Sequence, residues 1–397
     1  GGGGGGAGMT FWPFLITSLI KMIVVFTVIM VGVAFMTLVE RRLCAFMQDR
    51  LGPNRVGPFG LLQPAADGLK NIVKEETYPA FADKWLFILA PAISFTPALL
   101  TFAVIPFAAP LATKWGVVPM VVADLPVGFL YILAISSLGV YGIVLAGWAS
   151  NNKYALLGGL RASAQMISYE IAMGMSTVAV LLLAGNVTLS QVITEQQQGF
   201  WNIVPLLVAF FLFLISALAE TNRVPFDLPE AEGELIAGYH TEYSSMKFSM
   251  FYIAEYSNML TASALMATLF FGGWDLLFIH WDASQGLVWW QVLITLGVFC
   301  AKTSFFVLLY MWIRWTMPRF RYDQLMALGW KVMLPLALIY LTTLAAAIWY
   351  LRVQLGWTWG HKFAWALGAV NLVIFVILVW VLDRGRVVSG TVERKAA

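Results

Sequence analysis

Residues 11–39 read FWPFLITSLIKMIVVFTVIMVGVAFMTLV, and Lys21 is the only charged residue among them. A helix of about 20 apolar residues crosses the roughly 30 Å hydrocarbon core of a bilayer. At about 1.5 Å per residue this stretch exceeds that thickness, so we expect its helix to tilt or to begin in the interface near Lys21. The run is also too long for the apolar region of a cleavable signal peptide. It therefore predicts a first transmembrane helix.

Eight further apolar runs follow, in a chain of 397 residues that is 60% hydrophobic and only 11% charged. This composition excludes a soluble fold and predicts an all-α polytopic membrane protein with about nine transmembrane helices. The glycine-rich residues 1–8 have no apolar period, and we leave them out of the fold. The expected spans are 11–39, 85–108, 125–148, 161–184, 203–219, 248–271, 289–313, 332–351 and 363–382.

The basic residues between these spans predict the orientation. Nineteen of the 24 lysines and arginines fall in connections on one side, and the positive side of a membrane protein is the inner side. We therefore expect the N-terminus outside and the C-terminus inside, as an odd number of spans requires.

Two inner connections are long, residues 41–84 and 220–247. In the first, apolar residues recur at helical spacing over 61–74, which predicts an amphipathic helix in the inner interface. The second contains PFDLPEAEGEL (225–235), an acidic loop with no lysine or arginine. Asp227 and Glu230 fit the capping box of a short loop helix, which would explain much of this acidity without a functional role.

Redox ligands are scarce. The two cysteines are too few for an iron–sulfur or zinc site, and the three histidines never share helical spacing within one span. We predict no metal and no redox centre in this chain, so electrons for any redox reaction must come from a partner.

Four carboxylates lie within or at the edge of expected spans: Glu40, Glu170, Glu220 and Glu255. Such residues are costly in lipid and are functional candidates by default. Clustered, partly dehydrated carboxylates hold protons near neutral pH and titrate together, which suits a polar inlet for protons from the inner face. The alternative is structural ion pairing, of Glu40 with Arg41 or Arg42, of Glu220 with Arg223, and of Glu170 with Arg161 or Arg314.

Three other polar residues keep open interpretations. Lys302, in the seventh expected span, is either a proton-path residue or the partner of a buried carboxylate. Asp275 is expected to be a solvated residue of an outer loop. A histidine in the position of His240 is more often a hydrogen-bonded interface residue than a substrate contact.

Two segments resemble a known family. ERRLCAFMQDRLGPNRVGPFGLLQPAADGLKNIVKEE (40–76) and AETNRVPFDLPEAEGELIAGYHTEYSSMKFSMFYIAEYSNM (219–259) are similar to the most characteristic stretches of one membrane subunit family, the H or first subunit of proton-pumping NADH:quinone oxidoreductase, respiratory complex I. The resemblance covers residues 9–351 and its eight spans. Residues 352–397, with a ninth span and a basic tail, lie outside the family pattern.

The resemblance implies a membrane subunit that forms the quinone chamber with the peripheral arm and links quinone reduction to proton translocation. Quinone, ubiquinone by preference, would be the substrate, whereas NADH, FMN and iron–sulfur clusters would belong to partner subunits. The implied partners are the peripheral-arm subunits, the adjacent small membrane subunits and membrane lipid, with no nucleic acid. We expect the bacterial inner membrane and not the mitochondrial one, because the extra ninth span and tail depart from the compact mitochondrial form of the family. By motif position, the quinone chamber falls to Glu40, Arg41, Asp67, Arg223, Phe226 and Asp227, and the proton route to Glu170, Glu220, Glu230, Glu234, Glu242 and Glu255.

Three alternatives remain at this point. A membrane subunit of an energy-converting hydrogenase shares the architecture but takes other electron donors. A proton-coupled secondary transporter usually shows internal repeats, and neither signature segment has a second copy. A structural subunit without chemistry predicts that neutralising Glu170 or Glu230 leaves an assembled complex fully active.

Overall fold

The computed structural model describes residues 11–227, 236–276, 281 and 286–383. Within these ranges the chain is almost entirely helical, as the apolar runs predict. The helices are α1 (Phe11–Met47), α2 (Gln63–Val73), α3 (Lys84–Leu100), α4 (Gly128–Ala149), α5 (Lys153–Ala184), α6 (Leu189–Gln198), α7 (Leu207–Glu220), α9 (Ser245–Phe270), α10 (Trp289–Thr316), α11 (Tyr322–Ala327), α12 (Leu334–Trp349) and α13 (His361–Asp383).

Short elements join them. The 3₁₀ turns are η1 (Pro58–Gly60), η2 (Thr101–Val104) and η3 (Gly238–His240), and the π-helical stretches are η4 (Leu328–Met333) and η5 (Tyr350–Gln354). One antiparallel hairpin, β1 (Leu111–Thr113) and β2 (Gly116–Val118), pairs Leu111 with Val118. Neither this hairpin nor α6 was expected from the apolar runs, because both are short and lack a long apolar stretch.

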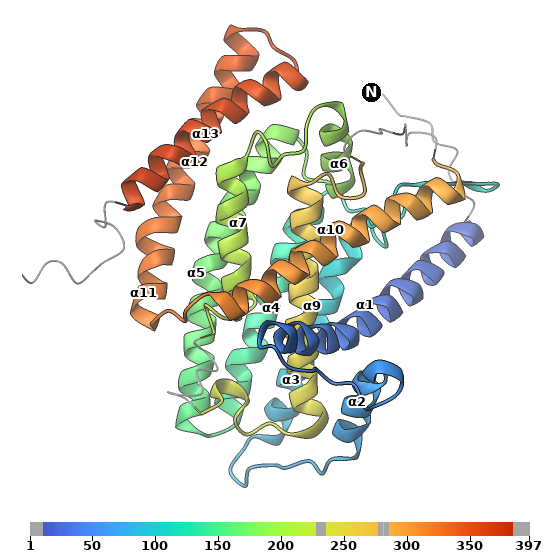
Figure 1. The fold of residues 1–397 in the computed structure, drawn as a ribbon, viewed down its shortest axis with the longest axis vertical. Helices are drawn as coiled ribbons and strands as arrows, with labels where there is room; N and C mark the ends of the chain where they lie inside the picture. The colour runs from blue at the N-terminus through green and yellow to red at the C-terminus, as the bar shows by residue number, and fades with distance from the viewer. Residues whose placement is uncertain (1–10, 228–235, 277–280, 282–285, 384–397) are drawn as a thin grey trace, which may run out of the picture.

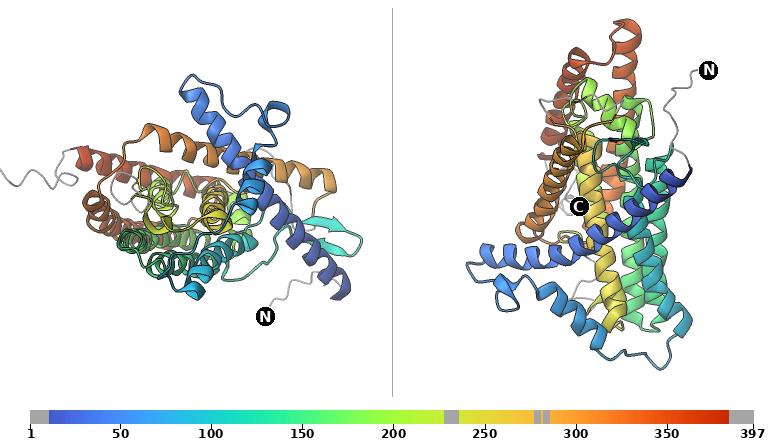
Figure 2. Two further views of the ribbon diagram at one scale, coloured as in Figure 1. Left: turned by 90° about the horizontal axis from the view of Figure 1, so that it is seen from below. Right: turned by 90° about the vertical axis from the view of Figure 1, so that its right-hand side faces the viewer.

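The helices form a bundle around α5, α7 and α9, and two long helices cross it obliquely. Figure 1 shows α1 and α10 running diagonally over the upright helices, and the side view in Figure 2 shows the same slant for α1. The tilt expected for the overlong first helix is therefore present relative to its neighbours. The end of the bundle that carries η3 and α2 is called the η3 end below, and the opposite end, with α6 and the hairpin, the α6 end (Figure 1).

Seven helical segments of the described residues are long and apolar enough to span a membrane. The remaining two expected spans are also helical but differ in kind. The fifth is α7, with 14 residues, because the chain turns at 201–206 before the helix begins. The sixth is α9, whose 26 residues include Lys247 and Glu255 and so are less apolar. The nine expected spans thus all correspond to helices.

Several boundaries differ from the sequence prediction for local reasons. Helix α5 begins eight residues before the expected 161, because Asn152 caps it by accepting from the backbone N–H of Tyr154 at 2.9 Å. It ends at Ala184, and the next residue, Gly185, has a φ of 68°, the left-handed conformation that often follows a helix. The eighth span is one helical run over 322–354, because α11, η4, α12 and η5 follow each other without a break.

The ninth span is an integral part of the bundle. Helix α13 packs on α7 and α12, with Phe363, Leu367 and Asn371 fully buried. The Tyr340 hydroxyl of α12 donates to Oδ1 of Asn371 at 2.7 Å. Figure 1 shows α12 and α13 side by side along one flank.

Candidate functional site

The loop that follows α7 places the guanidinium of Arg223 at the centre of a buried charged cluster. Its Nε donates to Glu255 of α9 at 2.6 Å, and its Nη1 donates to Glu40 of α1 at 2.8 Å. Arg223 is only 3% exposed, so both pairs are shielded from water. Burial alone would lower the pKa of Arg223, but the carboxylates of Glu255 and Glu40 hold it well above its ordinary value.

Glu40 collects two more donors. The Tyr256 hydroxyl donates to its Oε2 at 2.5 Å, and Nη1 of Arg314 on α10 donates to its Oε1. The guanidinium of Arg223 also lies over the Tyr256 ring, 4.1 Å from its centroid. Two carboxylates and two guanidiniums from α1, α9, α10 and one loop therefore balance each other. We call Glu40, Arg223, Glu255, Tyr256 and Arg314 the Arg223 cluster.

These contacts replace the ion pairs expected from neighbouring residues in the sequence. Glu40 pairs with Arg223 and Arg314 in place of Arg41 or Arg42. Arg223 contacts Glu40 and Glu255 in place of Glu220, and Arg314 contacts Glu40 in place of Glu170. The reason is geometric, because residues adjacent on a helix point in different directions while distant helices bring their side chains to one point.

Two further ion pairs lie beside the cluster. Arg41 donates to Asp67 of α2 at 2.6 Å, and Gln63 donates to the other carboxylate oxygen at 3.1 Å, so the start of α2 is tied to the end of α1. Arg319 donates to Asp227 at 2.8 Å. Both pairs are partly exposed, at the level where the chain leaves the bundle.

The predicted amphipathic helix is present as α2, and its orientation is informative. The apolar residues Leu69, Ile72 and Val73 are each more than 60% exposed, whereas the polar Gln63 and Asp67 are half-buried. The apolar face therefore points away from this protein, as expected of a helix that lies in an interface.

Phe226 lies in the core. Its ring stacks on Phe320 with centroids 5.6 Å apart, and its centroid lies 5.8 Å from that of the Tyr169 ring. Its backbone carbonyl accepts from Gln165 at 2.8 Å. It anchors the loop that presents Arg223 and Asp227.

A small polar cavity of about 40 Å³ lies behind the cluster, and its lining includes both Glu220 and Glu255. Asn222, Asn258 and Thr221 supply further polar groups. A cavity of this size holds one or a few water molecules, because each needs about 10–15 Å³ of such space. Glu170, on α5, is close enough to Glu220 for their charges to repel each other. The structure therefore places these three carboxylates next to one another in space: Glu255 and Glu220 line the same cavity, and Glu170 lies near Glu220.

Glu242 is separate from this group. Its carboxylate accepts from Asn152 at 2.7 Å, in a cavity of about 320 Å³ lined by residues 79–81 and 150–154 at the η3 end. Nearby His240 packs edge-on against Tyr239 and Phe248, and burial lowers its pKa to about 4. Glu230 and Glu234, and the capping box of Asp227 with Glu230, fall on residues outside those described.

Sequence reasoning missed two members of the site, Tyr256 and Arg319, and named a third, Arg314, only as a partner for Glu170. Each lies on a helix or a short connection with no distinguishing motif, and the carboxylate that accepts its hydrogen bond lies at least 92 positions away in the sequence. No local signal could have found them.

Two other polar residues have structural roles at the end of α9. The prediction that Asp275 is a solvated loop residue is wrong. Its side chain is buried, at 1% exposure, and accepts hydrogen bonds from Gln197 and Trp201. Lys302 donates to the backbone carbonyls of Phe271, Gly273 and Asp275 and so caps the end of α9.

No group of three or more histidine, cysteine, aspartate or glutamate residues that could hold a metal is found in the described ranges. What the site offers is proton chemistry and electrostatic binding. It combines fixed guanidinium donors, a tyrosine hydroxyl and a row of carboxylates reached through a polar cavity.

Comparison with known proteins places this geometry in a family. The family model described as NADH dehydrogenase matches residues 20–345, which include every residue of the Arg223 cluster. The H subunit of the NADH-quinone oxidoreductase of Leptospira biflexa is 49% identical over 356 residues, covering 87% of this chain and 98% of that protein. The H 1 subunit of the Geobacter metallireducens enzyme is 53% identical, and the match covers 81% of this chain and 93% of that protein. The H 1 subunit of the Cytophaga hutchinsonii enzyme is 49% identical, and the match covers 84% of this chain and 97% of that protein. The chain therefore belongs to the NADH dehydrogenase family and is similar over most of its length to the H subunits of NADH-quinone oxidoreductases.

Proposed function

We propose that this chain is the membrane subunit of a bacterial respiratory complex I that forms the quinone chamber and passes the energy of quinone reduction to proton translocation. The observation that carries the proposal is the buried Arg223 cluster, with a polar cavity and further carboxylates directly behind it. The subunits that carry NADH, FMN and iron–sulfur clusters would be partners, and quinone, ubiquinone by preference, would be the substrate.

The chemistry of the Arg223 cluster suits a quinone headgroup. Reducing a quinone adds two electrons and two protons, and negative charge develops on its oxygens on the way. Fixed guanidinium groups stabilise such charge, and a neighbouring carboxyl group that has taken up a proton can supply it to a quinone oxygen. Nη2 of Arg223 is buried and has no hydrogen-bond partner in the described part of the chain, so it is a donor with capacity for a ligand or a water molecule.

The path for the isoprenoid tail is supported by an apolar groove of about 450 Å³. It begins at Leu43, one turn after Glu40, and is completed by Met47, Phe305, Leu308, Leu309 and Trp312 from α1 and α10. These lining residues are all apolar or aromatic. The exposed apolar face of α2 adds a second surface compatible with lipid and with an isoprenoid chain.

The proton side of the proposal runs from Glu255 through the small cavity to Glu220 and Glu170. Uptake of a proton at Glu40 or Glu255 would weaken their hold on Arg223, because a neutral carboxyl attracts a guanidinium less strongly. The released cation would then act on the next carboxylates across the cavity. Glu242 lies at the η3 end and is a proposed member of the route by motif position alone.

For orientation, we propose the N-terminus outside, the C-terminus inside and the location in the inner membrane. The excess of lysine and arginine in the connections of the η3 end supports this assignment. Peripheral-arm subunits would then dock on the η3 end, beside Arg41, Asp67 and Asp227, and adjacent small membrane subunits on the lateral faces.

The test uses the assembled complex in proteoliposomes, with NADH-driven quinone reduction and proton translocation measured in the same sample. Glu220→Gln is expected to lower the number of protons moved per NADH at least twofold while quinone reduction continues. Glu75→Gln, an exposed loop carboxylate, is the matched control and should leave both rates unchanged. Full pumping by Glu220→Gln would contradict the proton route. Hydrogen evolution instead of quinone reduction would support the energy-converting hydrogenase alternative.

A further inference from the structure

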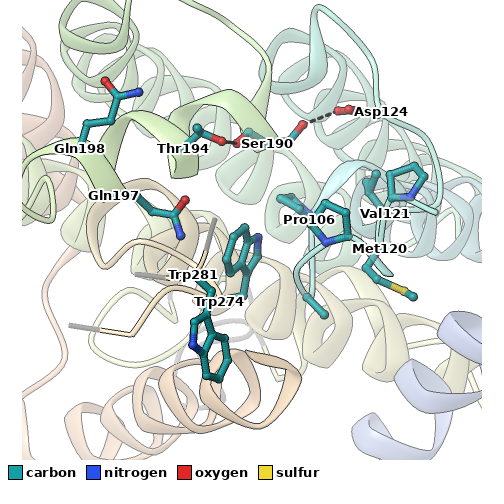
Figure 3. A pocket seen from close by; sticks show the side chains of 13 residues that line it. Pro106, Met120, Val121, Asp124, Ser190, Thr194, Gln197, Gln198, Trp274 and Trp281 are labelled. Carbon is teal, nitrogen blue, oxygen red and sulfur yellow. Dashed lines mark hydrogen bonds between the residues drawn. The ribbon is translucent and has the colours of Figure 1, made fainter. Parts of the chain in front are cut away.

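The α6 end contains a cavity of about 450 Å³ that the quinone and proton chemistry does not use. Figure 3 shows its two unlike walls. The polar wall is one face of α6, with Ser190, Thr194, Gln197 and Gln198 at helical spacing. The apolar wall consists of Pro106, Pro110, Pro119, Met120, Trp274 and Trp281. A cavity of this size accommodates a small organic group.

A carboxylate and an ammonium group frame this cavity. Asp124 lines it and accepts a hydrogen bond from Ser190 at 2.6 Å (Figure 3). Lys21 of α1 lies at its rim, because its Nζ donates to the carbonyls of Pro119 and Val121 at 3.1 and 2.8 Å, and both residues line the cavity. Lys21 and Asp124 are near enough to interact electrostatically. The site therefore carries one charge of each sign and is neutral as a whole.

The surroundings place this cavity at the depth of lipid headgroups. Tryptophans gather in membrane proteins where water meets hydrocarbon, and the α6 end exposes Trp12, Trp115, Trp289 and Trp290. Trp281 of the cavity packs edge-on against Trp290, with centroids 5.9 Å apart. Next to Lys21, α1 exposes Leu19, Ile20 and Ile23 by about half or more, which is a surface for acyl chains.

We propose that this cavity binds the headgroup of a zwitterionic aminophospholipid, with the ammonium at Asp124 and the phosphate at Lys21. Its acyl chains would lie on the exposed face of α1. The separated charges match a headgroup that carries both signs, and the indole and proline wall covers its ethylene carbons. An anionic phospholipid without an amine offers no cation to Asp124 and adds a net negative charge to a site that is neutral as a whole.

The test is lipid retention by the assembled complex. The complex is delipidated, incubated with phosphatidylethanolamine or phosphatidylglycerol of matched acyl chains, washed in detergent and analysed by native mass spectrometry. We expect wild-type complex to retain phosphatidylethanolamine about tenfold more strongly than phosphatidylglycerol, the effect of one charge-assisted contact. Equal retention of the two lipids would overturn the proposal, and this comparison needs no variant.

Variants localise the effect. Asp124→Asn removes the charge, and Thr194→Trp fills the cavity from the exposed face of α6, so each should reduce phosphatidylethanolamine retention about tenfold. Lys114→Gln, an exposed lysine of the hairpin outside the cavity, is the control and should change nothing. Unchanged retention by both cavity variants would overturn the site. Equal competition by soluble glycerophosphoethanolamine would overturn the lipid assignment and show that the ligand is a free zwitterion.

Discussion

Arg223 is the residue on which the candidate site depends. It contacts two carboxylates from two helices through different nitrogens, Nε toward Glu255 and Nη1 toward Glu40. A lysine has one nitrogen and cannot reproduce this geometry, although it carries the same charge. The residue therefore joins α1 to α9 by shape as well as by charge.

Arg223→Lys is expected to lower quinone reduction by the assembled complex about tenfold or more. The substitution leaves one buried carboxylate without its cation, and breaking a buried pair costs about 3–5 kcal/mol. Steady-state quinone reduction and the thermal midpoint of the complex measure the two effects. Arg321→Lys, at a guanidinium whose side chain is 80% exposed, is the control. Wild-type activity in Arg223→Lys would show that quinone reduction does not depend on the guanidinium geometry of Arg223.

At this scale the sequence identified the acids and one base but not how they pair. Glu40 and Glu255 stood out because charges in apolar surroundings are rare, and Arg223 stood out by its place beside Glu220 and in a motif shared with the family. Their actual connections join residues 32, 183 and 274 positions apart, which no local pattern encodes. Tyr256 was missed, and Arg314 was expected beside Glu170 instead of Glu40, for the same reason, because these contacts exist only once the helices pack.

Lys302 shows how an element's end determines the role of one residue. Its ammonium lies 2.6–3.0 Å from three carbonyls where α9 stops, and 4.1 Å from the centroid of the Trp201 ring. The carbonyls of the turn that follows α9 need donors when they are removed from water, and the helix dipole favours a cation at the C-terminal end of a helix. The arrangement favours a capping role over proton transport.

Lys302→Met is therefore expected to lower stability without stopping proton translocation. Leaving buried carbonyls without donors costs about 1–3 kcal/mol, which appears as a reduced thermal midpoint of the complex. Lys331→Met, at an exposed lysine of η4, should have no effect on either measurement. Loss of pumping at an unchanged midpoint would instead assign Lys302 to the proton route.

The η3 turn before α9 is expected to weaken as pH falls. Burial holds the pKa of His240 at about 4, below its ordinary 6.5. Between these values the open segment takes up a proton and the folded one does not, so the stabilisation present above pH 6.5 is lost progressively toward pH 4. By about pH 5 the loss is about 2 kcal/mol. Hydrogen exchange of residues 238–252 in the assembled complex measures this change. His240→Leu should show a smaller pH dependence, and an equal dependence would assign it to other groups.

Among the elements, the long apolar helices were the most predictable and the short ones the least. Helix α2 was predicted with its boundaries nearly correct because its apolar residues recur at helical spacing. Helix α6 has four buried or half-buried polar positions among its ten residues and so lacks such a signal. Tertiary contacts hold it, such as Gln196 accepting from the backbone N–H groups of Asn202 and Gly272.

For the whole molecule, helix α13 lies beyond the part of the chain that the family model matches. The family match ends at residue 345, yet α13 is joined to the bundle by the Tyr340–Asn371 hydrogen bond and by the stacked rings of Phe211 and Phe375, with centroids 5.2 Å apart. These contacts lie on α7 and α12, whereas the Arg223 cluster is built from α1, α9, α10 and the loop after α7. Helix α13 therefore supports the flank of the bundle from outside the site.

A chain that stops after residue 355 is expected to assemble and reduce quinone but with a lower thermal midpoint. Removing α13 deprives the Tyr340 hydroxyl of its acceptor and exposes the flank of α7 to lipid; hydrogen bonds between membrane helices are worth about 0.6–2 kcal/mol each. Asn371→Leu in the full chain should reproduce part of the shift. Loss of quinone reduction in normally assembled complex would show that the ninth helix contributes to the chemistry.

The equal numbers of carboxylates and guanidiniums in the Arg223 cluster have an electrical consequence. A transmembrane voltage exerts no net force on a group whose charges cancel, so the resting cluster is insensitive to the potential that the respiratory chain maintains. One captured proton gives the cluster a unit charge, on which about 100 mV acts with up to about 2.3 kcal/mol across the full membrane. The membrane potential would therefore act on the cluster only after it has captured a proton. Before that, the cluster would keep the same geometry with or without a potential across the membrane.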